Sequence, residues 1–302
     1  MKKEKNPKVS VIMSVYNEPE SYLRKAIESI LNQTYTDFEF IIILDNPKNE
    51  KLDKIIKEYL EKDKRIVYLK NIKNLGLAGS LNQGIRIAKG KYIARMDADD
   101  ISLPNRLKIQ VEFMEKNKEI DLLFTFYNLI DEKGKFLGRI HPSINGKIHN
   151  PKKYFLMNKL YIHHPTLLVK SKILKENMYD ETLRSSEDYD LWLRLFKNKN
   201  KYVFYILPQY MLNYRIIIDD KFGRIRKLYR YSKYKFISSI KNLPLYIFDE
   251  YFLLYIFQVF NNFFWLAITT LIPKRILIFM ISIKDNMKTY TPIDKKYSQL
   301  TN

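Results

Sequence analysis

Three aspartates stand within four positions directly after an apolar run, in the stretch ARMDADDISLP of residues 94–104. Asp97, Asp99 and Asp100 have no histidine or cysteine beside them. Carboxylates grouped in this way are hard oxygen ligands that suit Mg²⁺ or Mn²⁺, ions that are usually shared with substrate phosphates. The alternative is a solvated turn that caps a helix beginning near Pro104, since aspartate favours caps and proline favours the first helical turn. The stretch by itself leaves both interpretations open.

A second acidic cluster lies in the stretch SSEDYDLWLRL of residues 185–195. Its structural interpretation is a helix that Ser186 caps, with Glu187 and Asp188 in the first turn near the positive end of the helix dipole. A helix N-terminus would also keep Asp188 ionised near neutral pH, the state in which a carboxylate can accept a proton. The apolar face of this helix would consist of Leu191, Trp192, Leu195 and Phe196.

Regularly spaced apolar runs must position these acids. The runs at residues 9–15, 38–44, 65–69 and 92–96 are each followed by a helical pattern, which is typical of βαβ units around a parallel sheet. Ligands of such sheets bind beyond the carboxyl ends of the strands, and polar residues follow every run here. We therefore predict an α/β nucleotide-binding architecture. The position of the aspartates at a strand end weakens the cap interpretation.

The combined motifs resemble the family 2 glycosyltransferases of the inverting GT-A fold. The matching stretches, in family order, are VSVIMSVYNE, YLRKAIESILNQTYTDFEFIIILDN, NLGLAGSLNQGIRIAKGKYIARMDADD, LPNRLKIQVEFM and SEDYDLWLRL. They cover roughly residues 8–215. The resemblance implies a nucleotide-sugar donor, most often a UDP-sugar, bound in the N-terminal half. It also implies an acceptor that meets the segment after the acidic motif.

The resemblance assigns roles at the donor side. The family's D-x-D motif corresponds to Asp97-Ala98-Asp99, so that Asp97 faces the ribose or the metal and Asp99 coordinates the metal on the diphosphate. Tyr16 would stack on the base and Asp45 would accept its N–H; many members have a second acid after Asp45, where this chain has Asn46. Asn74, Gly76 and Asn82 match an N-x-G-L pattern and would form a wall of the donor site, although Gly76 would also suit a turn. The expected donor-binding residues are Ser14, Tyr16, Asn17, Glu18, Asp45, Asn74, Gly76, Asn82 and Asp97.

The resemblance also assigns the acceptor side. The family's Glu-Asp pair supplies the catalytic base; Asp188 matches the aspartate, and Glu187 is the alternative. In inverting transfer this carboxylate takes the proton of the acceptor hydroxyl as its oxygen attacks the anomeric carbon. His164, in IHHPTLLV, matches a His-Pro of many relatives and is an acceptor-side candidate together with Trp192. A histidine hydrogen-bonded for structural reasons is the alternative at position 164.

The charge of the chain indicates an anionic partner. Lys and Arg number 53 against 33 Asp and Glu, a net charge of +20 in 302 residues. Nucleic acid, anionic lipid and phosphorylated substrates all fit this charge. The absence of cysteine favours a reducing compartment, and the first apolar run is too short for a signal peptide, so we expect a cytoplasmic protein.

The C-terminal part changes in character. Residues 221–241 contain eight basic residues and no acid, and residues 251–273 contain 23 residues without a charge. The second segment is long enough to span a bilayer, but five polar residues make it a poor spanning helix: Gln258, Asn261, Asn262, Thr269 and Thr270. We predict that residues 221–283 lie on an anionic membrane surface as interfacial helices. Helices packed on the domain and a transmembrane anchor are the alternatives.

These observations together predict a metal-dependent inverting glycosyltransferase that uses Mn²⁺ or Mg²⁺. We expect a GT-A domain at residues 1–217, with a donor half at 1–100 and an acceptor half at 101–217, and a basic helical tail at 218–302. The expected reaction moves a hexosyl or N-acetylhexosaminyl group from a nucleotide sugar to a lipid-linked saccharide acceptor. We expect this step to belong to cell-surface polysaccharide synthesis and to take place at the inner face of the cell membrane. The alternatives are a nucleotidyltransferase of similar α/β layout and a protein that binds nucleic acid or membranes without catalysis. Acids at the strand ends would repel nucleic acid, so we expect none as a partner.

Overall fold

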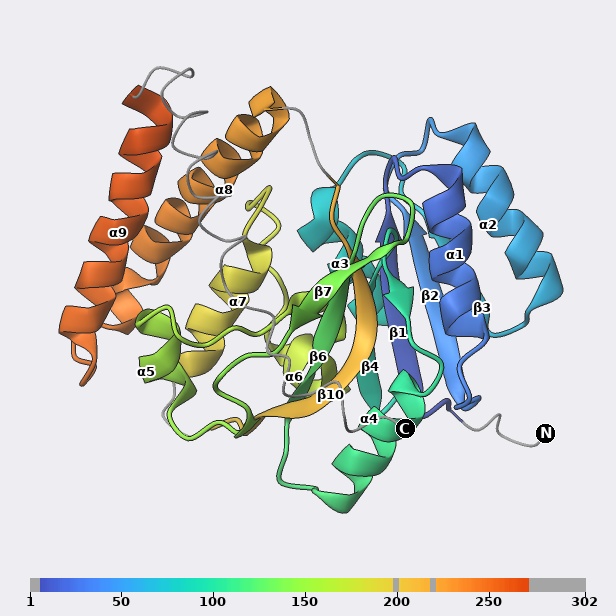
Figure 1. The fold of residues 1–302 in the computed structure, drawn as a ribbon, viewed down its shortest axis with the longest axis horizontal. Helices are drawn as coiled ribbons and strands as arrows, with labels where there is room; N and C mark the ends of the chain where they lie inside the picture. The colour runs from blue at the N-terminus through green and yellow to red at the C-terminus, as the bar shows by residue number, and fades with distance from the viewer. Residues whose placement is uncertain (1–5, 198–200, 218–220, 272–302) are drawn as a thin grey trace.

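The computed structural model describes residues 6–197, 201–217 and 221–271. Within these residues a mixed sheet of ten strands has the order β3-β2-β1-β4-β9-β6-β10-β5, with β7 paired to β6 and β8 to β10. Helices cover both faces of the sheet (Figure 1). This layered arrangement confirms the predicted α/β class.

The N-terminal half consists of parallel strands joined by helices, as the apolar runs predicted. β1 (Val9–Val15) pairs in parallel with β2 (Phe38–Leu44) and with β4 (Tyr92–Asp97), and β2 pairs in parallel with β3 (Ile66–Lys70). β3 and β4 each end one residue later than predicted. The connecting helices are α1 (Glu20–Leu31), α2 (Glu50–Lys62) and α3 (Gly76–Ile87).

The second half of the domain extends the same sheet with strands of both directions. β9 (Leu168–Lys170) runs antiparallel to β4 and to β6 (Leu122–Ile130), and β10 (Phe204–Arg215) runs parallel to β6. The short strands are β5 (Ile101–Ser102), β7 (Phe136–Ile140) and β8 (Gly146–Lys147). The helical segments are α4 (Arg106–Lys116), α5 (Pro151–Leu156), η1 (His164–Thr166), α6 (Ser171–Glu176) and α7 (Glu187–Phe196).

The two faces of the sheet have separate hydrophobic cores. One core packs α1, α2 and α4 against β1, β2 and β4. The other packs α3, α6 and α7 against the opposite side chains of the same strands and against β6 and β10. Alternate side chains of a strand point to opposite faces, and because both faces are covered, β1, β2 and β4 are buried along almost their whole length and mostly apolar. These buried strands fix the positions of the polar residues at their ends.

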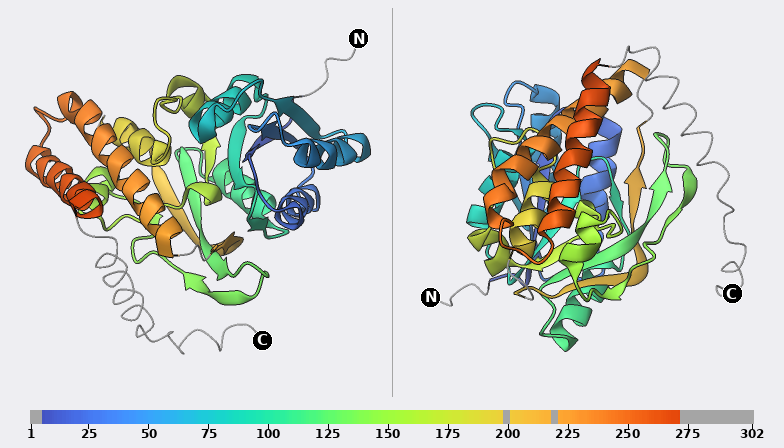
Figure 2. Two further views of the ribbon diagram at one scale, coloured as in Figure 1. Left: turned by 90° about the horizontal axis from the view of Figure 1, so that it is seen from above. Right: turned by 90° about the vertical axis from the view of Figure 1, so that its left-hand side faces the viewer.

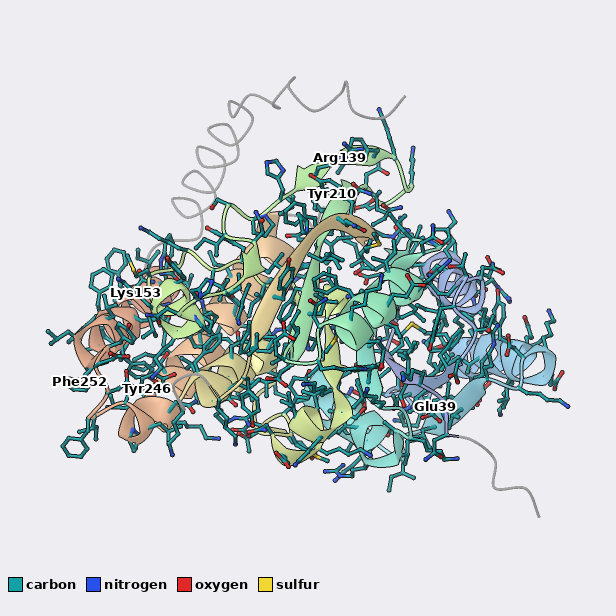
Figure 3. All side chains as sticks on the ribbon, turned by 90° about the horizontal axis from the view of Figure 1, so that it is seen from below. Glu39, Arg139, Lys153, Tyr210, Tyr246 and Phe252 are labelled. Atoms are coloured by element: carbon teal, nitrogen blue, oxygen red, sulfur yellow. The ribbon has the colours of Figure 1, made fainter. Side chains whose placement is uncertain are left out.

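The C-terminal helices pack at one end of the molecule. α8 (Lys221–Asn242), η2 (Leu243–Leu245) and α9 (Phe252–Leu271) lie beyond α5 and α7, at the opposite end from α1 and α2 (Figures 1 and 2). A third hydrophobic cluster joins them to the domain through Leu156, Tyr189, Leu193, Tyr246 and Tyr255. Figure 3 shows Tyr246 and Phe252 at this end and Glu39 far away on β2.

α9 turns three of its polar side chains, Gln258, Asn262 and Thr269, toward the protein and most of its large apolar side chains outward. Its buried residues are Tyr255, Gln258, Asn262 and Thr269. Asn262 donates hydrogen bonds to Tyr189 Oη (3.1 Å) and Ser239 Oγ (2.8 Å). The exposed residues of α9 include Leu253, Phe257, Phe260, Phe263, Phe264 and Leu271.

This orientation corrects one step of the sequence argument. Buried polar residues that we counted against a spanning segment face the domain. Among the described residues, α9 is the one helix long and apolar enough to cross a membrane, and 17% of its apolar window is buried in the protein. Residues 272–283 of the predicted membrane-binding segment lie outside the described residues.

Candidate active site

The strand register brings the first polar strand ends together. Ser14 of β1 pairs with Asp97 of β4 and with Ile43 of β2. Asp45 follows β2 directly, and its backbone N–H donates to Val15 O at the end of β1 (2.7 Å). These three ends therefore form one edge, as the βαβ pattern predicted.

Three carboxylates cluster at this edge. Oxygen atoms of Asp97, Asp99 and Asp100 lie within 4.8 Å of one another. Asp97 and Asp99 are half-buried, and Asp100 is fully buried. Asp100 Oδ1 accepts a hydrogen bond from the backbone N–H of Arg215 (2.9 Å), whereas Asp100 Oδ2 is buried without a hydrogen-bond partner. A buried unpaired acceptor is costly, and an oxygen-binding cation would satisfy it. The residues present therefore fit a hard divalent cation.

The acids of this cluster hold protons more strongly than usual. Burial, followed by the charges of Asp97 and Glu18, raises the pKa of Asp99 to about 7. Burial and the charges of Asp97 and Asp99 raise the pKa of Asp100 well above its usual range. Burial also raises the pKa of Glu18, although the backbone N–H of Tyr16 donates to it (2.7 Å). Excess negative charge in a confined site is the electrostatic signature of a cation site.

The cap interpretation of the aspartates is wrong. The acids are followed by β5, and α4 begins only at Arg106, after an N-cap at Asn105 that makes no side-chain capping bond. The acidic loop is instead held by Arg215 at the end of β10. Its Nε donates to Asp99 O (2.7 Å), and its Nη1 donates to Asp131 O (2.9 Å).

Arg95 places a buried positive charge behind the cluster. It lies two positions before Asp97 on β4 and forms an ion pair with it. Burial alone would lower the pKa of Arg95, but the charge and hydrogen bond of Asp97 and the charge of Glu187 raise it. Arg95 thus lies within electrostatic range of both acidic motifs. Arg95 was not among the predicted site residues. The run YIARM nevertheless contained a signal for it, because a charged residue inside a buried strand almost always has a charged partner.

The first loop presents an open aromatic ring. Tyr16 is 47% exposed, which leaves its ring free to meet a flat ligand. Asn17 Oδ1 accepts hydrogen bonds from Asn46 Nδ2 (2.7 Å) and Asn49 Nδ2 (3.1 Å), so it joins the first and second strand ends.

Asp45 organises the loop that precedes α3. Its carboxylate accepts hydrogen bonds from Asn71 Nδ2 (2.8 Å), Asn74 Nδ2 (3.2 Å), and the backbone N–H groups of Leu75 (2.7 Å) and Gly76 (2.9 Å). Four donors occupy the acceptor positions that a carboxylate offers. Direct contact between Asp45 and a base N–H, as predicted, would therefore need one of these bonds to be released.

Gly76 and Asn82, both predicted to form a wall of the donor site, lie in different environments. Gly76 adopts φ +78°, and a Cβ there would lie 2.8 Å from Arg184 Nη1, so this turn favours glycine. Asn82 is buried, and its side chain is fully used by the protein. It donates to Tyr179 O and Glu181 Oε1 (both 2.9 Å) and accepts from Tyr179 N (3.0 Å). These contacts tie α3 to the segment before α7, and the assignment of Asn82 to the donor-site wall stays a prediction.

The second acidic motif begins α7, as predicted, but not by the predicted cap. Ser186 occupies the N-cap position with φ +61° and makes no side-chain capping bond. Its hydroxyl donates instead to Tyr231 O of α8 (3.3 Å). Asp188 Oδ1 accepts from the backbone N–H of Tyr189 (2.7 Å). Glu187 is 8% exposed, and Asp188 is half-buried.

Burial outweighs the helix N-terminus in setting the charge of this pair. Burial, followed by the charge of Asp188, raises the pKa of Glu187 to about 7. Burial also raises the pKa of Asp188, although the Tyr189 N–H, Arg95 and Lys235 oppose it. Burial therefore works against the helix N-terminus at Asp188, and the expectation that this carboxyl is ionised near neutral pH stays a prediction.

The two acceptor-side candidates lie in the core. His164 is buried, its Nε2 is 2.6 Å from Tyr179 Oη, and burial holds its pKa well below the usual range. Trp192 is 2% exposed and packs edge-on against Phe124 and His164. Neither side chain faces solvent, which favours the structural alternative at His164, and the two acceptor-side assignments stay predictions.

His163, which we did not select, lies closer to the acids. Its ring stacks on Tyr127 (centroids 4.0 Å apart) and meets Tyr214 edge-on (4.5 Å). Its Nε2 is buried without a hydrogen-bond partner, and burial lowers its pKa to about 3, so the ring is neutral. The charges of Asp97 and Asp100 act on Tyr214, which places this aromatic group beside the acidic cluster.

A cavity of about 260 Å³ lies elsewhere, between α5, β10 and the segment before α9. Lys152, Tyr202 and Tyr251 are among its lining residues, and none of the predicted site residues lines it. The acidic cluster is a better candidate active site than this cavity. Among the described residues, the cavity lining has no comparable group of unpaired polar atoms.

Comparison with known proteins places the chain in a sequence family. Residues 10–183 match Glycosyl transferase family 2. An uncharacterized glycosyltransferase of Methanocaldococcus jannaschii is 47% identical over 280 residues, which cover 92% of this chain and 94% of that protein. The O-antigen biosynthesis glycosyltransferase WbnJ of Escherichia coli is 39% identical over 211 residues, which cover 69% of this chain and 79% of WbnJ.

Solved structures agree on the fold. S. aureus TarS 1–349 in complex with UDP-GlcNAc has a TM-score of 0.62 at 16% identity, and the match covers 93% of this chain and 81% of that one. The complex of the same protein with UDP has a TM-score of 0.58 at 19% identity, covering 77% of this chain and 65% of that one. At these identities the likeness shows a common fold.

Proposed function

Because this chain belongs to glycosyl transferase family 2 and has its GT-A fold, we propose that it transfers a hexosyl or N-acetylhexosaminyl group from a nucleotide sugar with inversion. A UDP-sugar is the proposed donor, and the complexes of TarS with UDP and UDP-GlcNAc support this choice by analogy of fold. A saccharide in cell-surface polysaccharide synthesis is the proposed acceptor, supported by the O-antigen biosynthesis role in the name of WbnJ.

The observation that carries the proposal is the acidic cluster with its unpaired Asp100 Oδ2. Asp97 and Asp99 would hold Mg²⁺ or Mn²⁺, and Asp100, which the D-x-D motif does not include, would be a further oxygen donor. Such an ion supplies positive charge to the leaving diphosphate. Ser14 lies beside Asp97 in the strand register, which supports a donor position at this edge.

The chain's own residues perform the remaining steps. Tyr16 offers an exposed ring to the base, and Asn17 and Glu18 flank it. Asp45 holds Asn74 and Gly76 in place, so its proposed contribution is to shape the donor loop.

Asp188 is the proposed base that takes the proton of the acceptor hydroxyl, with Glu187 as the alternative. General-base catalysis is most efficient when the pKa of the base lies near the operating pH, which the raised pKa values of this pair favour. Neither acid makes a side-chain ion pair at its carboxylate among the described residues, so both remain available to accept a proton.

The proposal places the enzyme at the cytoplasmic face of an anionic membrane, with a lipid-linked acceptor. The tail at residues 218–302 is the proposed membrane-binding part and residues 1–217 the catalytic part. The outward apolar side chains of α9 support this, as do the exposed basic residues of α8, Arg226, Lys227, Arg230 and Lys233. Each Lys or Arg near anionic lipid contributes about 1 kcal/mol of attraction.

The test is a panel of nucleotide sugars incubated with the protein and Mn²⁺ or with EDTA. We expect metal-dependent release of a nucleoside diphosphate, together with a glycoside whose anomeric configuration is opposite to that of the donor. The Asp99→Asn variant is the matched control and should release none. Release of inorganic diphosphate from a nucleoside triphosphate would identify a nucleotidyltransferase instead, and retention of configuration would overturn the inverting mechanism.

A further inference from the structure

The C-terminal helix α8 packs directly on the helix that carries the Glu-Asp pair (Figure 1). Ser238 Oγ (3.0 Å) and Asn242 Nδ2 (2.8 Å) donate hydrogen bonds to Asp190 Oδ1 on α7. At the other end of this contact, Ser186 Oγ donates to Tyr231 O. Helix α8 therefore contacts the first turn of α7 at two points, Ser186 and Asp190.

Lys235 lies in the middle of this contact. Its ammonium group is 4.4 Å from the ring centre of Tyr189 and 5.0 Å from that of Tyr231. Among the described residues no carboxylate lies within ion-pairing distance of Lys235, although its position is half-buried. Tyr189 follows Asp188 directly and donates its backbone N–H to that carboxylate. A half-buried cation thus lies over the ring of Tyr189, the residue that follows the proposed base in the sequence.

We propose that Lys235 is a positioning residue for the transfer reaction: it brings a positive charge from the tail to Asp188 and favours the ionised carboxylate that accepts the acceptor proton. The inference rests on the proposed function, with Asp188 as the base. It makes the tail a part of the catalytic centre as well as the proposed membrane-binding part.

The groups that face Asp188 support this role. They are Arg95 from β4, Tyr179 from the segment before α7, Glu187 and Tyr189 from α7 itself, and Tyr231 and Lys235 from α8. Two of these are cations, and Arg95 is already paired with Asp97. Burial lowers the pKa of Lys235 to about 8, against the opposing effect of Asp188, so the ammonium form persists at neutral pH.

The neutral variant Lys235→Met should weaken catalysis in a pH-dependent way. A nearby opposite charge lowers the pKa of a carboxyl by about 1 to 3 units. The half-buried position of Lys235 favours the lower figure. The acid limb of the kcat/KM profile should therefore move up by about one pH unit in the variant. This corresponds to about a tenfold loss of rate below the limb and little loss above it.

The experiment measures kcat/KM of the full-length protein as a function of pH. UDP-GlcNAc is the first donor tried, followed by any nucleotide sugar that is active in the panel described under the proposed function. Lys235→Arg keeps the charge and should retain the wild-type acid limb. Lys235→Gln is a second neutral variant of similar length and should shift the limb as Lys235→Met does. Lys54→Met is the control, because Lys54 is an exposed lysine of α2, at the opposite end of the molecule from α8 (Figure 1).

The outcomes separate this inference from the proposed function. A loss that is equal at every pH, or a rise in acceptor KM with an unmoved limb, would overturn the role of Lys235. The second of these results would identify it as a binding site for an anionic acceptor group. If Asp188→Asn retains activity, the proposed base is wrong and the inference fails with it. If Asp188→Asn is inactive and both neutral Lys235 variants leave the limb in place, the inference alone fails.

Discussion

Replacing Asp99 with Asn should stabilise the metal-free protein while it abolishes the response to metal. The pKa of Asp99 is raised to about 7 by burial and by the charges of Asp97 and Glu18. The native state therefore binds more protons than the unfolded chain between the ordinary value of 3.8 and about 7. Stability consequently falls as the pH rises through this window, and the loss is complete above it.

The magnitude follows from this window. Moving a pKa from 3.8 to about 7 corresponds to roughly 4 kcal/mol at high pH. This figure is an upper limit, because Asp97, Asp99 and Asp100 share their repulsion and Asp99 retains contact with water. Above pH 8, Asp99→Asn should therefore raise the free energy of unfolding of the metal-free protein by about 2 kcal/mol. In a protein of 302 residues this raises Tm by about 4 °C.

Thermal unfolding in EDTA and in excess Mn²⁺ measures both effects. In EDTA the difference between Asp99→Asn and wild type should be near zero at pH 4 and largest above pH 8. In Mn²⁺ the wild type should gain stability by mass action and the variant should gain little. Glu61→Gln, which removes an exposed acid of α2, is the control and should follow the wild type. A variant less stable than wild type in EDTA at pH 8.5 would refute the electrostatic argument, and an equal gain from Mn²⁺ would refute the metal assignment.

Three further predictions address the base, the donor loop and the tail. Asp188→Asn should lower kcat by about 10² to 10⁴-fold with donor affinity unchanged by calorimetry, and the reverse ranking with Glu187→Gln would make Glu187 the base. Gly76→Ala should cost about 1 kcal/mol in urea unfolding and raise the donor KM, because φ is +78° there; an unchanged unfolding midpoint would contradict this. The double variant Phe257→Ser and Phe264→Ser should reduce sedimentation with anionic vesicles at unchanged Tm, since these rings are exposed; undiminished sedimentation would exclude α9 as the docking face.

The sequence could predict the strands and the acidic loop because their signals are local. Residues 40–44 are apolar at five consecutive positions, and that pattern indicates a strand buried on both faces. The three aspartates follow such a strand directly, so their position at the sheet edge required no knowledge of the rest of the chain. The resemblance to family 2 glycosyltransferases was confirmed by the family match over residues 10–183 and by the relatives.

The direction of single side chains could not be predicted, because distant segments decide it. Asn82 bonds with residues 179 and 181, almost a hundred positions away, so the local sequence could not show the partners of its side chain. His164 and Trp192 meet each other in the core for the same reason. Arg215 gave no local signal either, since its role comes from carbonyl groups at positions 99 and 131.

The polar residues of α9 bear on how the protein can meet a membrane. A spanning orientation would require α9 to leave α8 and α7, which would break the bonds from Asn262 to Tyr189 and Ser239 and the pairing of Gln258 with Asn158. The freed amides would then enter hydrocarbon, where an unpaired polar group costs several kcal/mol. In the docked orientation these amides stay paired, and Phe257 and its exposed neighbours already face outward. The hydrogen bonds that hold α9 on the domain therefore favour contact with the bilayer surface over insertion, and the same contacts keep Lys235 of α8 beside the Glu-Asp pair.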